Sequence, residues 1–167
     1  MKKSGAGAAT IDRNPSRLRM NYTILSNVSV KKDLEFWLKE VLAALKATSG
    51  TVHVHEDGGL RLVAAINIPL SVQQIVQWVP NGKGMAGLAL QRREPVQTCN
   101  LQEDGSGDVK PGAKAVDAQA AVAIPVQNPG DGEVRGVVGV AFQEEREFTA
   151  ADLKEMTRVV STMPQVV

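Results

Sequence analysis

The sequence predicts an α+β fold built on an antiparallel sheet of five to six strands. Apolar residues recur at helical spacing near both ends of the chain, whereas segments between them alternate apolar and polar residues, as strands do. Short turns rich in glycine, asparagine and aspartate separate neighbouring strand segments, and such turns join antiparallel strands. This order of elements argues against a doubly wound parallel sheet.

Length and composition indicate one globular domain behind a basic tail. The chain has 167 residues, 43% of them hydrophobic, and a net charge of +1. Residues 1–20 hold five basic residues against one acidic residue, so this segment carries +4 and the remainder −3 (+1 − 4). We therefore predict a disordered basic tail over residues 1–20 and a single domain over residues 21–167. The mildly acidic body predicts no nucleic-acid partner.

Cysteine content and hydropathy bear on the cellular compartment. Cys99 is the only cysteine, so no disulfide can form within one chain. No apolar run reaches the ~18 residues of a membrane span, and none near the start has the length that a signal peptide needs. We predict a cytoplasmic protein with no membrane partner.

The first helix is predicted over residues 33–48. Its main apolar stripe consists of Leu34, Trp37, Leu38, Val41, Leu42 and Leu45. Phe36, Ala43 and Ala47 form a smaller apolar patch on the opposite side of this helix. Because the main stripes pack on the sheet, we predict that this second patch pairs two copies of the chain. The expected homodimer uses helices 33–48 and 149–163.

The last helix is predicted to begin with a capping box. Thr149 can accept a hydrogen bond from the start of the helix, and Asp152 stands where the reciprocal acid belongs. The apolar stripe of this helix consists of Leu153, Met156, Val159, Val160 and Met163.

The first two strands are predicted to form a hairpin. In residues 51–55 the alternation places Val52 and Val54 on one face and His53 and His55 on the other. Asp57-Gly58-Gly59 is a turn signal. The return strand is predicted to direct one set of side chains to a single face, namely Leu60, Leu62, Ala64, Ile66 and Ile68. Further strands are expected over residues 95–99, 120–126 and 134–142, with a long polar loop over residues 100–118.

Three glycines follow a short predicted helix that contains Ile75 and Trp78. Gly82, Gly84 and Gly87 match the pattern G-x-G-x-x-G of dinucleotide-binding loops. A core parallel strand should precede such a loop, and here a short helical segment ending at Pro80 does. We interpret the glycines as a structural turn, with Met85 directed inward and Lys83 outward.

The same stretch, Gly-Lys-Gly-Met-Ala-Gly-Leu-Ala followed by Arg-Arg-Glu-Pro-Val, resembles the central signature of GAF domains. Four further segments resemble family motifs in the right order, at residues 57–64, 121–126, 136–141 and 148–153. The resemblance implies a GAF-like fold, related to profilin-like and PAS domains. In that fold the terminal helices cover one face of the sheet, and loops and short helices enclose a ligand pocket on the other.

The resemblance and the strand pattern together suggest which residues line the pocket. They are His53, Ile75, Trp78, Met85, Gln97, Cys99 and Asn100. The chain has no third histidine to join His53 and His55 around a metal, so we predict no metal site. No feature of the sequence requires a cofactor.

The sequence shows no set of nucleophile, base and orienting group, so we predict that the protein is not an enzyme. The leading hypothesis is a non-catalytic GAF domain that senses an unidentified small molecule and relays a signal through a partner or a dimer. One alternative is a redox enzyme of the GAF-type methionine sulfoxide reductase kind that uses Cys99. A single cysteine cannot form the intramolecular disulfide of that cycle. The other alternative is an interaction or dimerisation module without a ligand.

Overall fold

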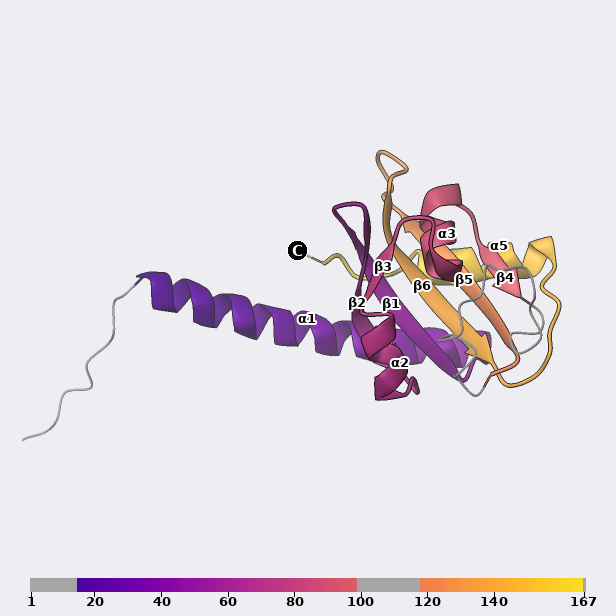
Figure 1. Ribbon diagram of the computed structural model, residues 1–167, viewed down its shortest axis with the longest axis horizontal. Coiled ribbons are helices and arrows are strands. Elements are labelled where there is room, and N and C mark those ends of the chain that lie inside the picture. Colours follow the sequence, from indigo (N-terminus) through magenta and orange to yellow (C-terminus); the bar gives the residue numbers. More distant parts are fainter. Residues whose placement is uncertain (1–14, 99–117, 167) are drawn as a thin grey trace, which may run out of the picture.

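The computed structural model describes residues 15–98 and 118–166. Its elements are α1 (Pro15–Leu45), β1 (Ser49–Glu56), β2 (Gly59–Ile66), α2 (Leu70–Ile75), β3 (Trp78–Pro80), α3 (Gly84–Arg92), β4 (Val96–Thr98), β5 (Ala120–Gln127), β6 (Val134–Phe142) and α5 (Ala150–Val160). The strands form one six-stranded sheet in the order β3-β2-β1-β6-β5-β4, with antiparallel pairing between all neighbours (Figure 1). The α+β fold predicted from the sequence is confirmed.

Helices α1 and α5 cover one face of the sheet. Val52 on β1 lies opposite Val138 on β6, which in turn lies opposite Ile124 on β5. All three side chains are fully buried beneath the two helices, together with Leu34 and Leu38 of α1. Burying side chains of this size contributes about 1.5–3 kcal/mol each, so this layer stabilises the fold.

The capping box predicted for the last helix is confirmed. The Asp152 backbone N–H donates to the Thr149 hydroxyl at 3.1 Å, and the Thr149 backbone N–H donates to the Asp152 carboxylate at 3.0 Å. Beyond α5, the guanidinium of Arg135 donates to the carbonyls of Met163 and Pro164, and the Trp37 indole N–H donates to Thr162. These bonds tie the end of the described chain to β6 and α1.

Helix α1 begins at Pro15, well before the predicted start at Asp33. The division into a tail over residues 1–20 and a domain over residues 21–167 stays a prediction. Proline is tolerated in the first turn of a helix, and no glycine or proline interrupts residues 16–45. Figure 1 shows the first half of α1 extending away from the sheet. No helix within residues 15–98 and 118–166 is both long and apolar enough to cross a membrane.

The face of α1 that points away from the sheet carries Phe36, whose side chain is 69% exposed. This residue belongs to the patch expected to pair two copies of the chain. The homodimer through the terminal helices stays a prediction.

A bulge in the first hairpin changes the faces of β2. Leu62 pairs with His53, but the next pair along the strands is Ala64 with Val52, so Val63 is an extra residue. Ala64 consequently packs in the core beneath α1, whereas Leu60 packs beneath α3. The prediction that the apolar residues of this strand share one face is therefore wrong.

Candidate ligand-binding site

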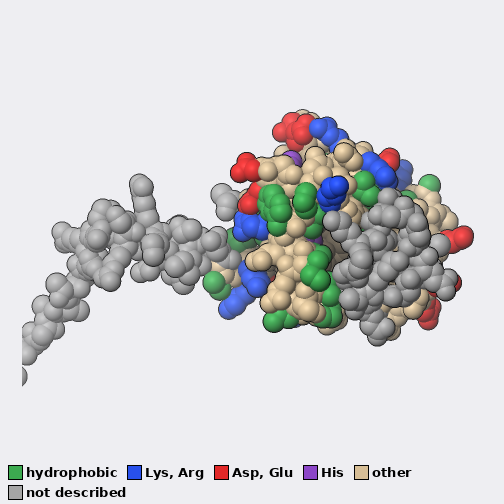
Figure 2. Space-filling view, in the orientation of Figure 1, with side chains coloured by type: hydrophobic (Ala, Val, Ile, Leu, Met, Phe, Trp, Pro, Cys, Tyr) green, Lys and Arg blue, Asp and Glu red, His purple; other side chains and the backbone are tan. Residues whose placement is uncertain are grey.

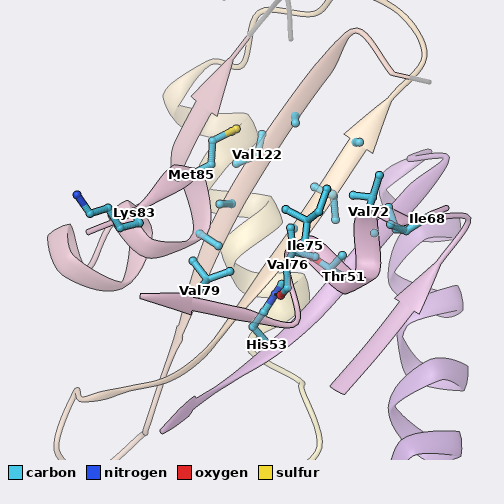
Figure 3. Close-up of a pocket in the computed structure, with 18 of the residues that line it drawn as sticks. Thr51, His53, Ile68, Val72, Ile75, Val76, Val79, Lys83, Met85 and Val122 are labelled. Carbon is cyan, nitrogen blue, oxygen red and sulfur yellow. The ribbon is translucent and has the colours of Figure 1, made fainter. Parts of the chain in front are cut away.

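A cavity of about 230 Å³ lies on the face of the sheet opposite α1 and α5. Its floor consists of strand residues from β1, β5 and β6, chiefly Thr51, Ala121, Ala123, Gly139 and Ala141. Its walls come from the segment that runs from the end of β2 through α2 and β3 into α3, including Ile68, Val72, Ile75, Val76, Trp78, Val79, Lys83 and Met85 (Figure 3).

The cavity exists because this face of the sheet carries small side chains. Thr51 lies opposite Gly139, and Gly139 lies opposite Ala123, so one row across three strands contains no large residue. A Cβ atom added to Gly139 would lie 2.7 Å from the Thr51 hydroxyl oxygen, which excludes any larger residue without movement. The helix-covered face has valine and isoleucine at the alternate positions. Because successive side chains of a strand point to opposite faces, one face of the sheet is filled by large residues and the other is left hollow by small ones.

His53 is the buried polar residue of this cavity, with only 3% of its surface exposed. Its Nε2 lies 2.9 Å from the carbonyl oxygen of Val76, at the end of α2. A carbonyl only accepts, so Nε2 must carry the proton and donate. Nδ1 is then an acceptor in the neutral ring, and it is buried without a hydrogen-bond partner among the described residues. Burial lowers the pKa of His53 from its usual 6.5, and the bond to Val76 opposes this shift only in part.

His55 has different surroundings, although it follows His53 on the same strand face. Its side chain is exposed, and its Nδ1 lies 2.9 Å from the Val134 carbonyl. Within the described residues, no three histidine, cysteine or carboxylate side chains gather as metal ligands.

The glycine turn positions α3 against the edge of the sheet. Gly82 and Gly84 have φ angles of 79° and 62°, which favour glycine. Gly87 has no such angle, but a Cβ atom there would lie 2.5 Å from the Pro80 carbonyl oxygen. The Gly82 backbone N–H donates to the Gly87 carbonyl at 2.9 Å. Helix α3 therefore lies directly on β3, and Met85 in its first turn reaches the cavity.

Four of the residues expected to line a pocket do line the cavity: His53, Ile75, Trp78 and Met85. Gln97 is not among the residues that line it, and its side chain is exposed on β4. Cys99 and Asn100 lie outside the described residues. A ligand role for the four lining residues stays a prediction.

The sequence reasoning missed the floor of the cavity. The signal was present in the strands that carry Ala121, Ala123, Gly139 and Ala141, where small residues stand at every second position. Lys83 lines the mouth, but Figure 3 shows its nitrogen directed away from the other labelled side chains.

Sequence comparison assigns the family. A model of the GAF domain matches residues 31–167. The chain belongs to the GAF domain family. No curated protein sequence matches the chain.

Solved structures of other proteins share this fold. Type II free methionine-R-sulfoxide reductase from Thermoplasma acidophilum is similar with a TM-score of 0.67 at 14% identity, covering 83% of this chain and 91% of its own. The GAF domain of an Acinetobacter phosphoenolpyruvate-protein phosphotransferase has a TM-score of 0.63 at 16% identity, and the match covers 90% of this chain and 91% of that one. Free methionine-R-sulfoxide reductase from Neisseria meningitidis, in complex with its substrate, has a TM-score of 0.61 at 14% identity and covers 94% of both chains.

The prediction that this GAF domain is not an enzyme is contradicted by these comparisons. Two of the three similar structures are reductases, so enzymes and phosphotransferase GAF domains share this architecture. The prediction rested on finding no nucleophile, base and orienting group in the sequence. That criterion fails here because a redox reaction at sulfur needs no such triad. At identities of 14–16%, the likeness itself concerns the fold.

Proposed function

We propose that this GAF domain binds a small, mostly apolar molecule in the cavity beneath α2 and α3. The observation that carries the proposal is the hollow face of the sheet, where small residues leave about 230 Å³ open beside a buried histidine. Ligand pockets have this character, because most of the lining is apolar and a few polar groups orient the ligand.

The rim of the cavity supports the same proposal. Ile75 and Trp78 line the cavity and are 63% and 44% exposed. Figure 2 shows apolar side chains at the surface of the face in view. Exposed apolar groups gathered around a hollow are typical of a binding site, because a ligand or a closing segment would remove them from water.

We further propose that occupancy is relayed to α1 through the sheet, in a cytoplasmic protein. Thr51 and His53 line the cavity, and the residues between and beside them on β1 pack against α1. A Cβ atom on Gly50 would lie 3.0 Å from the Leu42 side chain and 2.9 Å from the Gly139 carbonyl, so β1 and α1 are in close contact. A change in β1 on ligand binding would therefore change the packing of α1, which extends beyond the sheet (Figure 1).

Filling the cavity tests the binding proposal. Ala121→Leu adds three carbon atoms at the floor, and Ala43→Leu makes the same change on the exposed side of α1. In thermal melts with a library of small aromatic and aliphatic compounds, at least one compound should stabilise the wild type and Ala43→Leu but not Ala121→Leu. At a concentration of about 100 Kd the stabilisation is about 2.7 kcal/mol. Equal shifts in both variants would place the ligand elsewhere, and no shift in any protein would reject the proposal.

A second candidate function is the reduction of free methionine sulfoxide, which the similar reductase structures favour. In that reaction the Cys99 thiolate would attack the sulfoxide sulfur, releasing methionine and leaving a sulfenic acid on the protein. With one cysteine, an external thiol must reduce the sulfenic acid, giving water and a disulfide of the external thiol. The wild type with dithiothreitol should then consume methionine sulfoxide in NMR assays, and Cys99→Ser should not. Consumption equal to that of thiol alone would reject this candidate.

A further inference from the structure

We infer that the ligand places an uncharged hydrogen-bond acceptor, such as a carbonyl oxygen or a ring nitrogen, on the hydroxyl of Thr51 at the floor of the cavity. The inference rests on the proposed function, since it concerns the same cavity. Three features of the described residues lead to it: the position of the Thr51 hydroxyl, its lack of a partner, and the apolar floor around it.

The Thr51 hydroxyl lies on the hollow face of the sheet. Thr51 pairs with Gly139 across β1 and β6, and its hydroxyl oxygen lies 2.7 Å from the place where a Cβ atom of Gly139 would stand. Val138 beside Gly139 packs in the core beneath the helices, so that Cβ atom would point the opposite way, into the hollow face. The hydroxyl therefore occupies the room that glycine leaves at the floor of the cavity (Figure 3).

The Thr51 hydroxyl is open to the cavity and has no partner. Its side chain forms no hydrogen bond with the rest of the described chain. Within the described residues, its oxygen is not one of the enclosed side-chain atoms that lack a partner, whereas His53 Nδ1 is, so the hydroxyl is accessible and the ring atom is not. The other ring nitrogen of His53 already donates to Val76, so Thr51 is the polar group that the floor offers to a ligand.

The chemistry of this hydroxyl favours an acceptor on the ligand. A hydroxyl has one proton to donate and two lone pairs that accept. In protein interiors a donor without an acceptor is rarer than an oxygen with an unused lone pair, so the proton is the part that most needs a partner. A carbonyl oxygen or a ring nitrogen takes this proton, whereas a ligand that carries only an N–H leaves it unmet.

The floor favours an acceptor without charge. Around Thr51 it consists of glycine and alanine on β5 and β6, so a carboxylate seated there would lose its hydration without gaining an opposite charge, which is costly. Among the described lining residues, Lys83 is the one with a charged side chain, and its nitrogen is directed away from the other labelled side chains (Figure 3). A charged group on the ligand would therefore lie at the mouth of the cavity and not on Thr51.

The Trp78 indole is a second donor in the lining, but it stands at the rim. Its side chain forms no hydrogen bond with the rest of the described chain, and an indole N–H only donates. Trp78 is 44% exposed, and its ring packs on Gly59, where an added Cβ atom would lie 2.5 Å from a ring carbon. Water can accept from the indole N–H at this place, so Thr51 is the residue that selects the ligand.

Matched ligands and variants of Thr51 test this assignment by NMR titration. Acetophenone carries a carbonyl acceptor, N-methylaniline carries a donor, and isopropylbenzene has a similar size and neither group. Thr51→Val removes the hydroxyl and keeps the shape of the side chain, whereas Thr51→Ser keeps the hydroxyl. Thr51→Val should weaken the binding of acetophenone about tenfold and that of the other two compounds less than about threefold. Thr51→Ser should bind acetophenone within about threefold of the wild type.

A second measurement uses the wild type alone and decides the matter if Thr51→Val fails to fold. The methyl protons of acetophenone lie beside its carbonyl, so they should show nuclear Overhauser contacts to Thr51. The proton at the far end of the ring should show none. Contacts from the far end in place of the methyl group would overturn the assignment.

The outcomes separate this inference from the proposed function. If Thr51→Val weakens all three compounds equally or weakens none, Thr51 does not select the ligand, and the cavity remains a binding site. If Thr51→Val weakens N-methylaniline more than acetophenone, or if the wild type binds only compounds without an acceptor, the acceptor class is wrong. If no compound binds here or in the thermal screen, the proposed function itself fails.

Discussion

Gly87→Ala is expected to destabilise the domain by about 1–3 kcal/mol, the usual cost of forcing an extra carbon into a packed site. The added Cβ atom would lie 2.5 Å from the Pro80 carbonyl oxygen, a backbone atom, and the Gly82–Gly87 hydrogen bond holds the turn after β3 against α3. The intrinsic preference works the other way, since alanine favours a helix over glycine by about 1 kcal/mol. A net loss of stability in urea unfolding would thus come from the close contact, which must outweigh the helix preference of alanine.

Two other glycines provide matched controls. Gly130 has open space where a Cβ atom would lie, so Gly130→Ala should change stability by less than about 0.5 kcal/mol. Gly132 also has open space but a φ of 70°, so Gly132→Ala should show the cost of backbone conformation without crowding. If Gly87→Ala unfolds at the same urea concentration as Gly130→Ala, the packing of α3 on β3 is not what makes glycine necessary there.

The sequence was sufficient for the layers of the fold. Apolar periods of helical spacing located the parts of α1 and α5 that pack on the sheet, and Thr149 with Asp152 marked the start of the last helix. Alternation around His53 placed it on the face opposite Val52, and the structure has it there. These features are local, because each depends only on the spacing of residues within one segment.

The bulge in β2 could not be predicted from that spacing. Leu60, Leu62 and Ala64 alternate without interruption, yet Ala64 lies on the other face. Both faces of β2 are covered, and Val63 and Ile66 are also apolar, so an extra residue leaves no trace in hydropathy. Only the pairing with β1 reveals it.

The other errors have similar causes. Strand β4 has three residues, too few for an alternation that would show which face Gln97 occupies. The first half of α1 extends beyond the sheet and does not pack on it. The apolar stripe that predicts the second half is therefore not expected in the first half. The floor of the cavity depends on three strands in register, which connects Thr51, Gly139 and Ala123 across long sequence separations.

The unfolding free energy of this GAF domain is expected to fall as the pH drops below about 6.5, through the titration of His53. Burial lowers the pKa of the folded histidine below its usual value of 6.5. As the pH falls, the unfolded chain binds the proton first, so acid favours unfolding. The contribution of the neutral ring is fully present above the unfolded pKa and declines as the pH falls from there toward the folded pKa. The physical cause is burial of the ring, and no described residue would accept a hydrogen bond from the second N–H of an imidazolium.

His53→Gln isolates this contribution. The amide can keep the hydrogen bond to the Val76 carbonyl but does not titrate, so the variant should lose the slope while retaining the donor. Urea unfolding of both proteins between about pH 5 and about pH 7.5 gives the difference in stability, and carboxylates common to both cancel. Glu56 and Asp152 have pKa values lowered from 4.5 and 3.8 by hydrogen bonds to Arg61 and Thr149, so their effects come at lower pH. As the pH falls, the wild type should lose stability relative to the variant. If the two curves of unfolding free energy against pH run parallel, His53 does not resist protonation in the folded domain.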